Sequence, residues 1–174
     1  SCYFSPRLAS ERKEIASYVK KGENVLVMFG GVAPFAIVIA KLSNARKVIS
    51  VELGRECSKY AQINVKLNKV NDKVEIVQGD VRRKIRDFKQ KFDRIVMPRP
   101  NLKDSFLDVA FSAIKKKGNI HYYGFYEEDK KGELLELIKN EAKKARKKIK
   151  ILRVKKAGEI GKRKFRYRTD FRVL

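Results

Sequence analysis

The sequence predicts an α/β fold whose sheet is mostly parallel and contains one antiparallel strand at the C-terminal end. Between residues 24 and 52, an apolar run breaks at Gly30 and Gly31, continues with helical periodicity, and returns as a second apolar run that ends at Glu52. This order of strand, tight turn, helix and strand is typical of a parallel βαβ unit. Near the C-terminus, the strand-like runs 149–155 and 164–173 are joined by a Gly-containing turn that is too short for a crossover helix, so we expect them to pair antiparallel.

The segments between these two ends supply the remaining elements in alternating order. Leu8, Ile15 and Val19 share one face of a helix that opens the chain. Strands are expected at about 24–29, 47–52, 74–77, 92–97 and 119–125, and further helices at about 54–68, 102–115 and 131–148. Neither a linker nor an internal repeat divides the chain, so a single domain is expected.

Composition limits the class of protein. The chain has 174 residues, of which 43% are hydrophobic, enough for one domain with a real core. No apolar run approaches the ~20 residues of a membrane span, and no signal peptide is visible, so we expect a soluble cytoplasmic protein without membrane contact. Cys2 and Cys57 form neither a CxxC nor a zinc pattern, which predicts no bound metal, no disulfide framework and a reducing setting.

Charge is the second strong signal. The chain has 43 Lys and Arg against 20 Asp and Glu, a net charge of +23. The excess is concentrated in residues 139–174, where sixteen basic side chains face only Glu141, Glu159 and Asp170. A thermophile surface is the alternative explanation, but such surfaces gain glutamate together with lysine. The unbalanced charge therefore favours a nucleic-acid partner.

The turn between the first two strands indicates which cofactor the fold would accept. It reads Phe29-Gly30-Gly31-Val32-Ala33-Pro34-Phe35 and lacks the G-x-G-x-x-G spacing of dinucleotide sites. No basic residue lies between Glu23 and Lys41 to meet a phosphate, whereas an acid such as Glu52 at the next strand end can accept hydrogen bonds from a ribose diol. The segment therefore favours S-adenosylmethionine, which carries no phosphate.

A series of ordered motifs extends over nearly the whole chain. It comprises Phe4-Ser5-Pro6-Arg7-Leu8-Ala9-Ser10-Glu11-Arg12, Met28-Phe29-x-Gly31-Val32-x-Pro34-Phe35, Asn64-x-x-Leu67-Asn68, Gly79-Asp80-Val81-Arg82, Asp93-Arg94-Ile95-Val96-Met97-Pro98-x-Pro100 and Ile120-His121-Tyr122-Tyr123. With these motifs the chain resembles the archaeal and eukaryotic tRNA (guanine-N1)-methyltransferases, which modify the guanosine 3′ of the anticodon. A related family, the wybutosine-pathway aminocarboxypropyltransferases, shares the fold and the cofactor.

The resemblance implies a class I S-adenosylmethionine-dependent methyltransferase (Rossmann-like) fold, with S-adenosylmethionine as cofactor, tRNA as partner and a monomeric protein. Residues 1–22 would form an N-terminal segment and helix that pack on a methyltransferase domain of residues 23–174. Members of the family carry a tRNA-gripping region before the first motif. This chain begins almost at that motif, so the region is expected to be absent from it.

The resemblance also implies roles for individual residues. Arg7 matches the arginine that holds the target guanine, Glu52 the acid that binds the cofactor ribose, and Asp80 the acid near the adenine amino group. The alternatives are a phosphate or ion-pair arginine for Arg7, a surface carboxylate for Glu52 and a helix N-cap for Asp80. The full set of expected cofactor-binding residues is Phe29, Gly30, Gly31, Ala33, Glu52, Leu53, Asp80, Val81 and Pro98, and the expected catalytic residues are Arg7, Asp80, Pro98 and Asn101.

The chain departs from the family pattern at three positions. Val27 replaces an acid, Ala33 replaces a glycine, and Pro98 stands where a side-chain amide is common, with Asn101 three residues later as a substitute. A methyl group at Ala33 would crowd the turn if that residue needs a positive φ. Because of these departures, three interpretations remain open: methyl transfer, aminocarboxypropyl transfer and a non-catalytic RNA-binding relative.

Other candidate residues carry weaker signals. His121 lies inside an apolar strand, and Cys57 lies on a helix face with Tyr60 and Ala61, so packing is expected for both. In the last strand, aromatic residues alternate with Arg166, Arg168 and Arg172, which predicts one apolar and one basic face. The basic face could contact RNA phosphate or simply face solvent.

Overall fold

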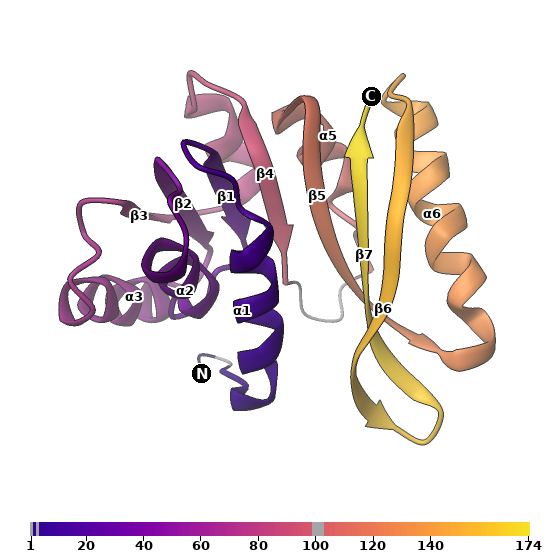
Figure 1. The fold of residues 1–174 in the computed structure, drawn as a ribbon, viewed down its shortest axis with the longest axis horizontal. Coiled ribbons are helices and arrows are strands. Elements are labelled where there is room, and N and C mark those ends of the chain that lie inside the picture. Colours follow the sequence, from indigo (N-terminus) through magenta and orange to yellow (C-terminus); the bar gives the residue numbers. More distant parts are fainter. Residues whose placement is uncertain (1, 3, 99–102) are drawn as a thin grey trace.

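A seven-stranded sheet forms the centre of the fold, with the strand order β3-β2-β1-β4-β5-β7-β6 (Figure 1). The computed structural model describes residues 2, 4–98 and 103–174. The strands are β1 (Asn24–Met28), β2 (Lys47–Glu52), β3 (Val74–Gln78), β4 (Phe92–Met97), β5 (Ile114–Glu127), β6 (Ile149–Gly161) and β7 (Lys164–Val173). Strands β1 to β5 are parallel, and β7 pairs antiparallel with both β5 and β6. The predicted sheet with its single antiparallel strand is confirmed.

The helices connect these strands in the alternating order that the sequence predicts. The α-helices are α1 (Ala9–Tyr18), α2 (Pro34–Leu42), α3 (Arg55–Leu67), α4 (Val81–Lys84), α5 (Leu107–Ala113) and α6 (Lys131–Lys144). Three short 3-10 helices, Pro6–Leu8, Ile85–Asp87 and Glu128–Lys130, complete the described elements. No helix in the described part of the chain is long and apolar enough to cross a membrane.

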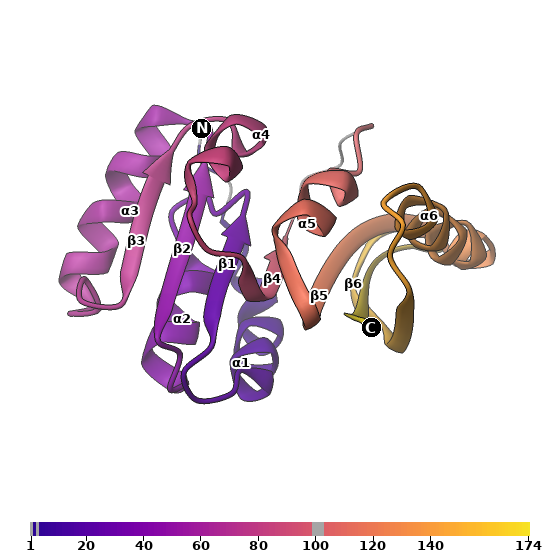
Figure 2. The ribbon, with the colours of Figure 1, turned by 90° about the horizontal axis from the view of Figure 1, so that it is seen from above.

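Two hydrophobic cores cover the two faces of the sheet, because successive strand residues point to opposite sides. Leu26 and Met28 of β1 pack in one core with residues of α5 and α6. Val25 and Val27 pack in the other core with residues of α1, α2 and α3. Seen from above, α2 and α5 lie on opposite sides of the central strands (Figure 2). Helix α1 therefore belongs to the same packed unit as the sheet.

Several boundaries differ from the sequence-based prediction. The helix expected at 102–115 is shorter, Leu107–Ala113, and β5 begins directly after it. Lys117 has a left-handed φ of 72°, and the pairing of β4 with β5 shifts between Phe92 and Arg94. The start of β5 is therefore an irregular strand and not the end of a helix. Strand β6 continues to Gly161 instead of ending near 155, because its backbone pairs with β7 as far as Lys164. Cross-strand pairing, which local periodicity does not report, decides these boundaries.

The expectation that Cys2 and Cys57 form no disulfide framework is wrong. Cys2 and Cys57 form a disulfide, with 5.4 Å between their Cα atoms and 55 residues between them in the sequence. The N-terminal segment folds back onto the start of α3, so the two thiols meet although their spacing follows no disulfide pattern. The cross-link ties residue 2 to the first turn of α3.

Candidate active site

A pocket of about 910 Å³ lies at the carboxyl ends of the parallel strands. This edge is where open α/β sheets bind their ligands. Its lining residues come from the ends of β1 to β4, from the N-terminal segment and from the β6–β7 hairpin, and they include Phe29, Gly30, Gly31, Glu52, Leu53, Asp80, Val81 and Pro98. The structure thus brings together all but one of the expected cofactor-binding residues, and the exception is Ala33.

The glycine turn after β1 leaves no room for a side chain. A Cβ atom added to Gly30 would lie 1.9 Å from Oγ of Ser50, and Gly31 has a φ of +58°. The Gly30 amide donates to the carbonyl of Val51 at 2.9 Å, so the turn lies directly against the end of β2. Gly30 therefore allows the backbone to form the pocket floor.

Ala33 lies at the end of this turn, as the N-cap residue of α2, and does not line the pocket. It is fully buried, and its φ of 71° is left-handed, the conformation that a glycine would adopt without strain. Val27, at the other departure from the family pattern, is also fully buried and packs in the core beside α1 and α2. Neither side chain lines the pocket.

Glu52 joins two loops of the pocket. Its Oε1 accepts a hydrogen bond from the Gly31 amide at 3.0 Å, and its Oε2 accepts one from the Gly54 amide at 2.7 Å. A carboxylate oxygen can accept more than one hydrogen bond, so both oxygens retain capacity for a ligand hydroxyl pair. Glu52 thus holds the floor of the pocket and presents acceptors to it.

Asp80 lies between β3 and α4 and is the N-cap residue of α4. Its Oδ1 accepts a hydrogen bond from the Arg82 amide at 2.9 Å, which is the N-cap interaction named as the alternative role of this residue. The same side chain lines the pocket. Capping and contact with a ligand are therefore compatible, because the cap engages only one carboxylate oxygen.

Arg12, rather than Arg7, is the arginine of the N-terminal segment that lines the pocket. Arg7 is exposed in the 3-10 helix Pro6–Leu8 and is absent from the lining, whereas Arg12 of α1 is buried and lines it. The Arg12 Nη2 donates to the carbonyl of Ser5 at 2.6 Å, and its guanidinium lies 4.8 Å from the centre of the Phe4 ring. Arg12 lies four residues after Leu8 and therefore on the apolar face of the opening helix. That position could have predicted its burial.

The segment after β4 contributes side chains that the sequence analysis did not single out. Pro98 lines the pocket, and Lys103, Asp104 and Phe106 continue the lining. Asn101, expected to be catalytic, lies outside the described residues. No local pattern marks Lys103, Asp104 or Phe106, because they reach the pocket only through the path of the chain between β4 and α5.

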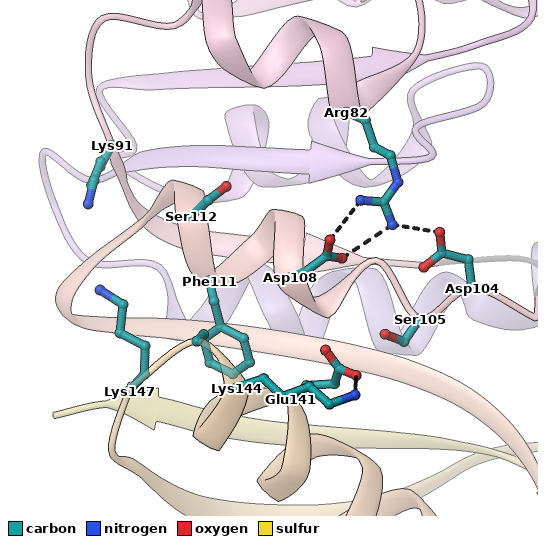
Figure 3. Close-up of a pocket in the computed structure, with 11 residues that line it drawn as sticks. Arg82, Lys91, Asp104, Ser105, Asp108, Phe111, Ser112, Glu141, Lys144 and Lys147 are labelled. Carbon is teal, nitrogen blue, oxygen red and sulfur yellow. Dashed lines mark hydrogen bonds and ion pairs between the residues drawn. The ribbon is translucent and has the colours of Figure 1, made fainter.

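Arg82 fixes this segment against the start of α4. Its guanidinium lies 2.5 Å from Oδ2 of Asp104, 2.7 Å from Oδ2 of Asp108 and 4.7 Å from the centre of the Phe106 ring. The hydrogen bond from Arg82 lowers the pKa of Asp108 despite partial burial. Figure 3 shows the fork between the two carboxylates, at the edge of a second hollow of about 810 Å³ that shares Asp104 with the first pocket.

His121 is packed, as expected, and the hydrogen bonds around it define its protonation. It is only 1% exposed, its Nδ1 lies 2.5 Å from Oδ1 of Asp170, and its Nε2 lies 2.7 Å from Nη1 of Arg94. Because arginine can only donate, Nε2 must accept and Nδ1 carries the proton. Burial lowers the pKa of His121, and the charge of Arg94 adds to this effect. The imidazole is therefore neutral and structural.

The basic face predicted for the last strand is only partly present. Arg168 is 0% exposed and reaches across to α1, where its guanidinium lies 2.7 Å from Oε1 of Glu11 and 3.0 Å from Oε1 of Glu14. The Tyr123 hydroxyl donates to the same Glu11 oxygen at 2.9 Å, and Tyr123 lines the pocket. Of the three arginines on this face, Arg166 is the one that reaches the pocket.

The whole chain resembles known tRNA-modifying proteins. Residues 1–152 match the family model of the TRM5/TYW2 methyltransferase domain. The chain is 41% identical to Pyrococcus abyssi tRNA (guanine(37)-N(1))-methyltransferase Trm5b over 172 residues, which is 98% of this chain and 50% of that protein. It also resembles two crystal structures. Trm5b from Pyrococcus abyssi matches with a TM-score of 0.88 and 39% identity, over 99% of this chain and 50% of that one. Methanocaldococcus jannaschii TYW2 in complex with AdoMet matches with a TM-score of 0.85 and 28% identity, over 98% of this chain and 77% of that one. The chain spans about half the length of the first two curated relatives it matches.

Proposed function

The chain belongs to the TRM5/TYW2 methyltransferase domain family, and from this premise we propose that it binds S-adenosylmethionine and methylates N1 of the guanosine 3′ of the tRNA anticodon. The observation that carries the proposal is the pocket floor formed by Gly30 and Glu52 at the carboxyl edge of the sheet. We further infer that the chain acts as a cytoplasmic monomer.

The pocket residues fit this cofactor in shape and chemistry. The backbone of Gly30 and Gly31 lines the pocket, and a Cβ at Gly30 would lie 1.9 Å from Oγ of buried Ser50, so only glycine lets the turn pack this closely against β2. Glu52 offers carboxylate acceptors for a ribose diol, and Asp80 offers one for an adenine amino group. The turn itself contains no basic residue, in keeping with a ligand that lacks phosphate. These features favour S-adenosylmethionine over a dinucleotide.

The chain's own contribution to the reaction is placement and electrostatics. S-adenosylmethionine supplies a methyl group already activated on a sulfonium sulfur. Pro98 and the segment that follows it would hold the guanine so that N1 faces that methyl group, because alignment supplies a large part of the rate. As N1 gains the methyl group, a base or water must accept the N1 proton, and a guanidinium would stabilise the negative charge that develops on O6. We assign this role to the N-terminal segment, in which Arg12 lines the pocket and Arg7, five residues earlier, is exposed.

Calorimetric titration of S-adenosylmethionine into the protein tests the pocket directly. We expect micromolar binding that Glu52→Ala abolishes and that Glu75→Ala, a change of an exposed carboxylate on β3, leaves unchanged. Binding that survives Glu52→Ala would refute the assignment of the pocket. An unaltered protein that does not bind at millimolar cofactor would refute the proposal that it is an S-adenosylmethionine-dependent enzyme.

The chemistry of transfer is tested by incubating the protein with unmodified tRNA and cofactor, followed by mass analysis of the nucleosides. N1-methylguanosine supports the proposal. Unchanged tRNA would contradict it. A second incubation with tRNA that carries 4-demethylwyosine, the base in the name of an aminocarboxypropyltransferase relative, then separates aminocarboxypropyl transfer from a non-catalytic RNA-binding relative.

A further inference from the structure

The β6–β7 hairpin extends beyond the rest of the sheet on the same side as the pocket. In Figure 1 its turn lies at the lower edge, where the chain's N-terminal segment also lies. Ile160 near the end of β6 and Arg166 near the start of β7 both line the pocket, beside Phe125 of β5. The hairpin turn is therefore a neighbour of the candidate active site, although it is remote from the glycine turn in sequence.

The hairpin carries two groups of basic side chains that differ in their partners. Toward its base, Arg153 pairs with Asp170, Lys155 with Glu11 and Lys156 with Glu128. At its turn, Lys162, Arg163 and Lys164 are exposed, and none of them forms an ion pair with a carboxylate of the described residues. We call these three residues the hairpin tip. Glu127 lies opposite Lys164 in the pairing of β5 with β7, and the charge of Arg163 helps to lower the pKa of Glu128. The hairpin tip thus places three basic side chains without a direct ion pair to the described carboxylates at the end of the hairpin nearest the pocket.

The surface between the hairpin tip and the pocket suits nucleotides. The Arg166 guanidinium lies over the Phe125 ring, 5.0 Å from its centre, and Ile160 is 45% exposed. Arginine and aromatic planes stack on unpaired bases, and lysine and arginine contact the phosphates that flank them. An RNA loop whose base enters the pocket would place its neighbouring phosphates at this surface.

Resting on the proposed function, we propose that the hairpin tip binds the RNA backbone beside the target guanosine and holds the anticodon loop at the mouth of the pocket. The partner is single-stranded RNA of the loop, recognised through its phosphates. The contact supplies affinity and position, and it does not read the base sequence.

The size of the effect follows from counterion release. Three phosphate contacts to single-stranded RNA contribute about 2 to the slope of log affinity against log salt, which corresponds to roughly 100-fold in affinity at 0.1 M salt. Neutralising the hairpin tip should remove up to that amount, while the affinity for the cofactor stays unchanged, because none of the three side chains lines the pocket.

The test measures the affinity of a fluorescent anticodon stem–loop RNA by anisotropy at several salt concentrations. The variant is Lys162→Gln/Arg163→Gln/Lys164→Gln. The control, Lys143→Gln/Arg146→Gln/Lys148→Gln, makes the same change in net charge at exposed positions at and beyond the C-terminal end of α6, at the opposite edge of the sheet (Figure 1). Cofactor binding is measured on all proteins by calorimetry.

We expect the tip variant to bind the RNA 10- to 100-fold more weakly, with the slope of log affinity against log salt reduced by about 2. The control should lose less than 3-fold in RNA affinity. Equal losses in both variants would overturn the inference and indicate a general charge effect. An unaltered protein that binds the cofactor but shows no RNA affinity would also overturn it and leave the pocket assignment standing. If the unaltered protein failed to bind cofactor, that result would count against the proposed function. The RNA affinities of the tip variant and the control would still decide whether the hairpin tip binds RNA.

Discussion

Replacing Arg168 with methionine tests whether a buried arginine holds the last strand to the first helix. Methionine keeps much of the side-chain volume, so the substitution removes charge and hydrogen bonds rather than creating a large cavity. In the native fold the Arg168 guanidinium contacts Glu11 at 2.7 Å, Glu14 at 3.0 Å and Asp170 at 3.1 Å. The variant would leave these carboxylates short of a partner.

The expected loss can be worked from burial. Glu11 and Asp170 have side chains only 3% and 1% exposed, so they cannot recover hydration. Breaking a buried ion pair on one side costs about 3–5 kcal/mol. Lys155 remains 3.2 Å from Glu11, and Arg153 remains 3.0 Å from Asp170, so part of the charge stays neutralised. We therefore expect the lower end, about 3 kcal/mol.

Urea unfolding followed by circular dichroism at pH 7 measures this loss, with the free energy of unfolding taken by linear extrapolation. Arg172→Met is the matched control, since Arg172 lies on the same strand, is half-buried and makes one hydrogen bond of 3.4 Å to Asn119. The control should lose less than about 1 kcal/mol. A loss for Arg168→Met below about 1 kcal/mol, or equal to the control, would refute the reasoning.

Three further predictions concern stability. Reducing the Cys2–Cys57 disulfide, which closes a loop of 55 residues, should lower the free energy of unfolding by up to about 4 kcal/mol, whereas the double serine variant should not respond to reductant in urea titrations. Ala33→Gly should raise stability by up to about 1 kcal/mol, because relief of a left-handed alanine outweighs the loss of one buried methyl group; a lower urea midpoint would contradict this. Acid should weaken the fold in two ranges of a urea series at stepped pH. Burial lowers the pKa of His121 in the folded state, so the free energy of unfolding should fall below pH 6.5, where the unfolded chain binds a proton there and the folded chain does not. It should fall again below pH 4.5, because the hydrogen bond from Arg168 lowers the pKa of Glu14 to about 2 in the folded state. A free energy of unfolding that stays constant from pH 7.5 to 3 would contradict both assignments.

Apolar periodicity predicted most of the fold, because the elements are long enough to show it. Strands β1 and β2 and helix α3 lie within two residues of their expected bounds. The prediction was wrong where pairing with another strand overrides local pattern, as in the long β5 and the continuation of β6 to Gly161. Within the pocket, Gly30, Glu52 and Asp80 were predictable because each closes a strand or follows it directly, and parallel strands end at one edge.

The sequence by itself determined the alternation of strands and helices, the glycine turn with Glu52 beside it, and the antiparallel end of the sheet. These features depend on spacing between near neighbours, which residue type and periodicity report. Only the tertiary structure decided that Cys2 meets Cys57, that Arg12 rather than Arg7 reaches the pocket, and that Arg168 is buried against Glu11. The last contact joins residues 157 positions apart, and such a meeting depends on how packed layers place whole elements, which no local pattern encodes.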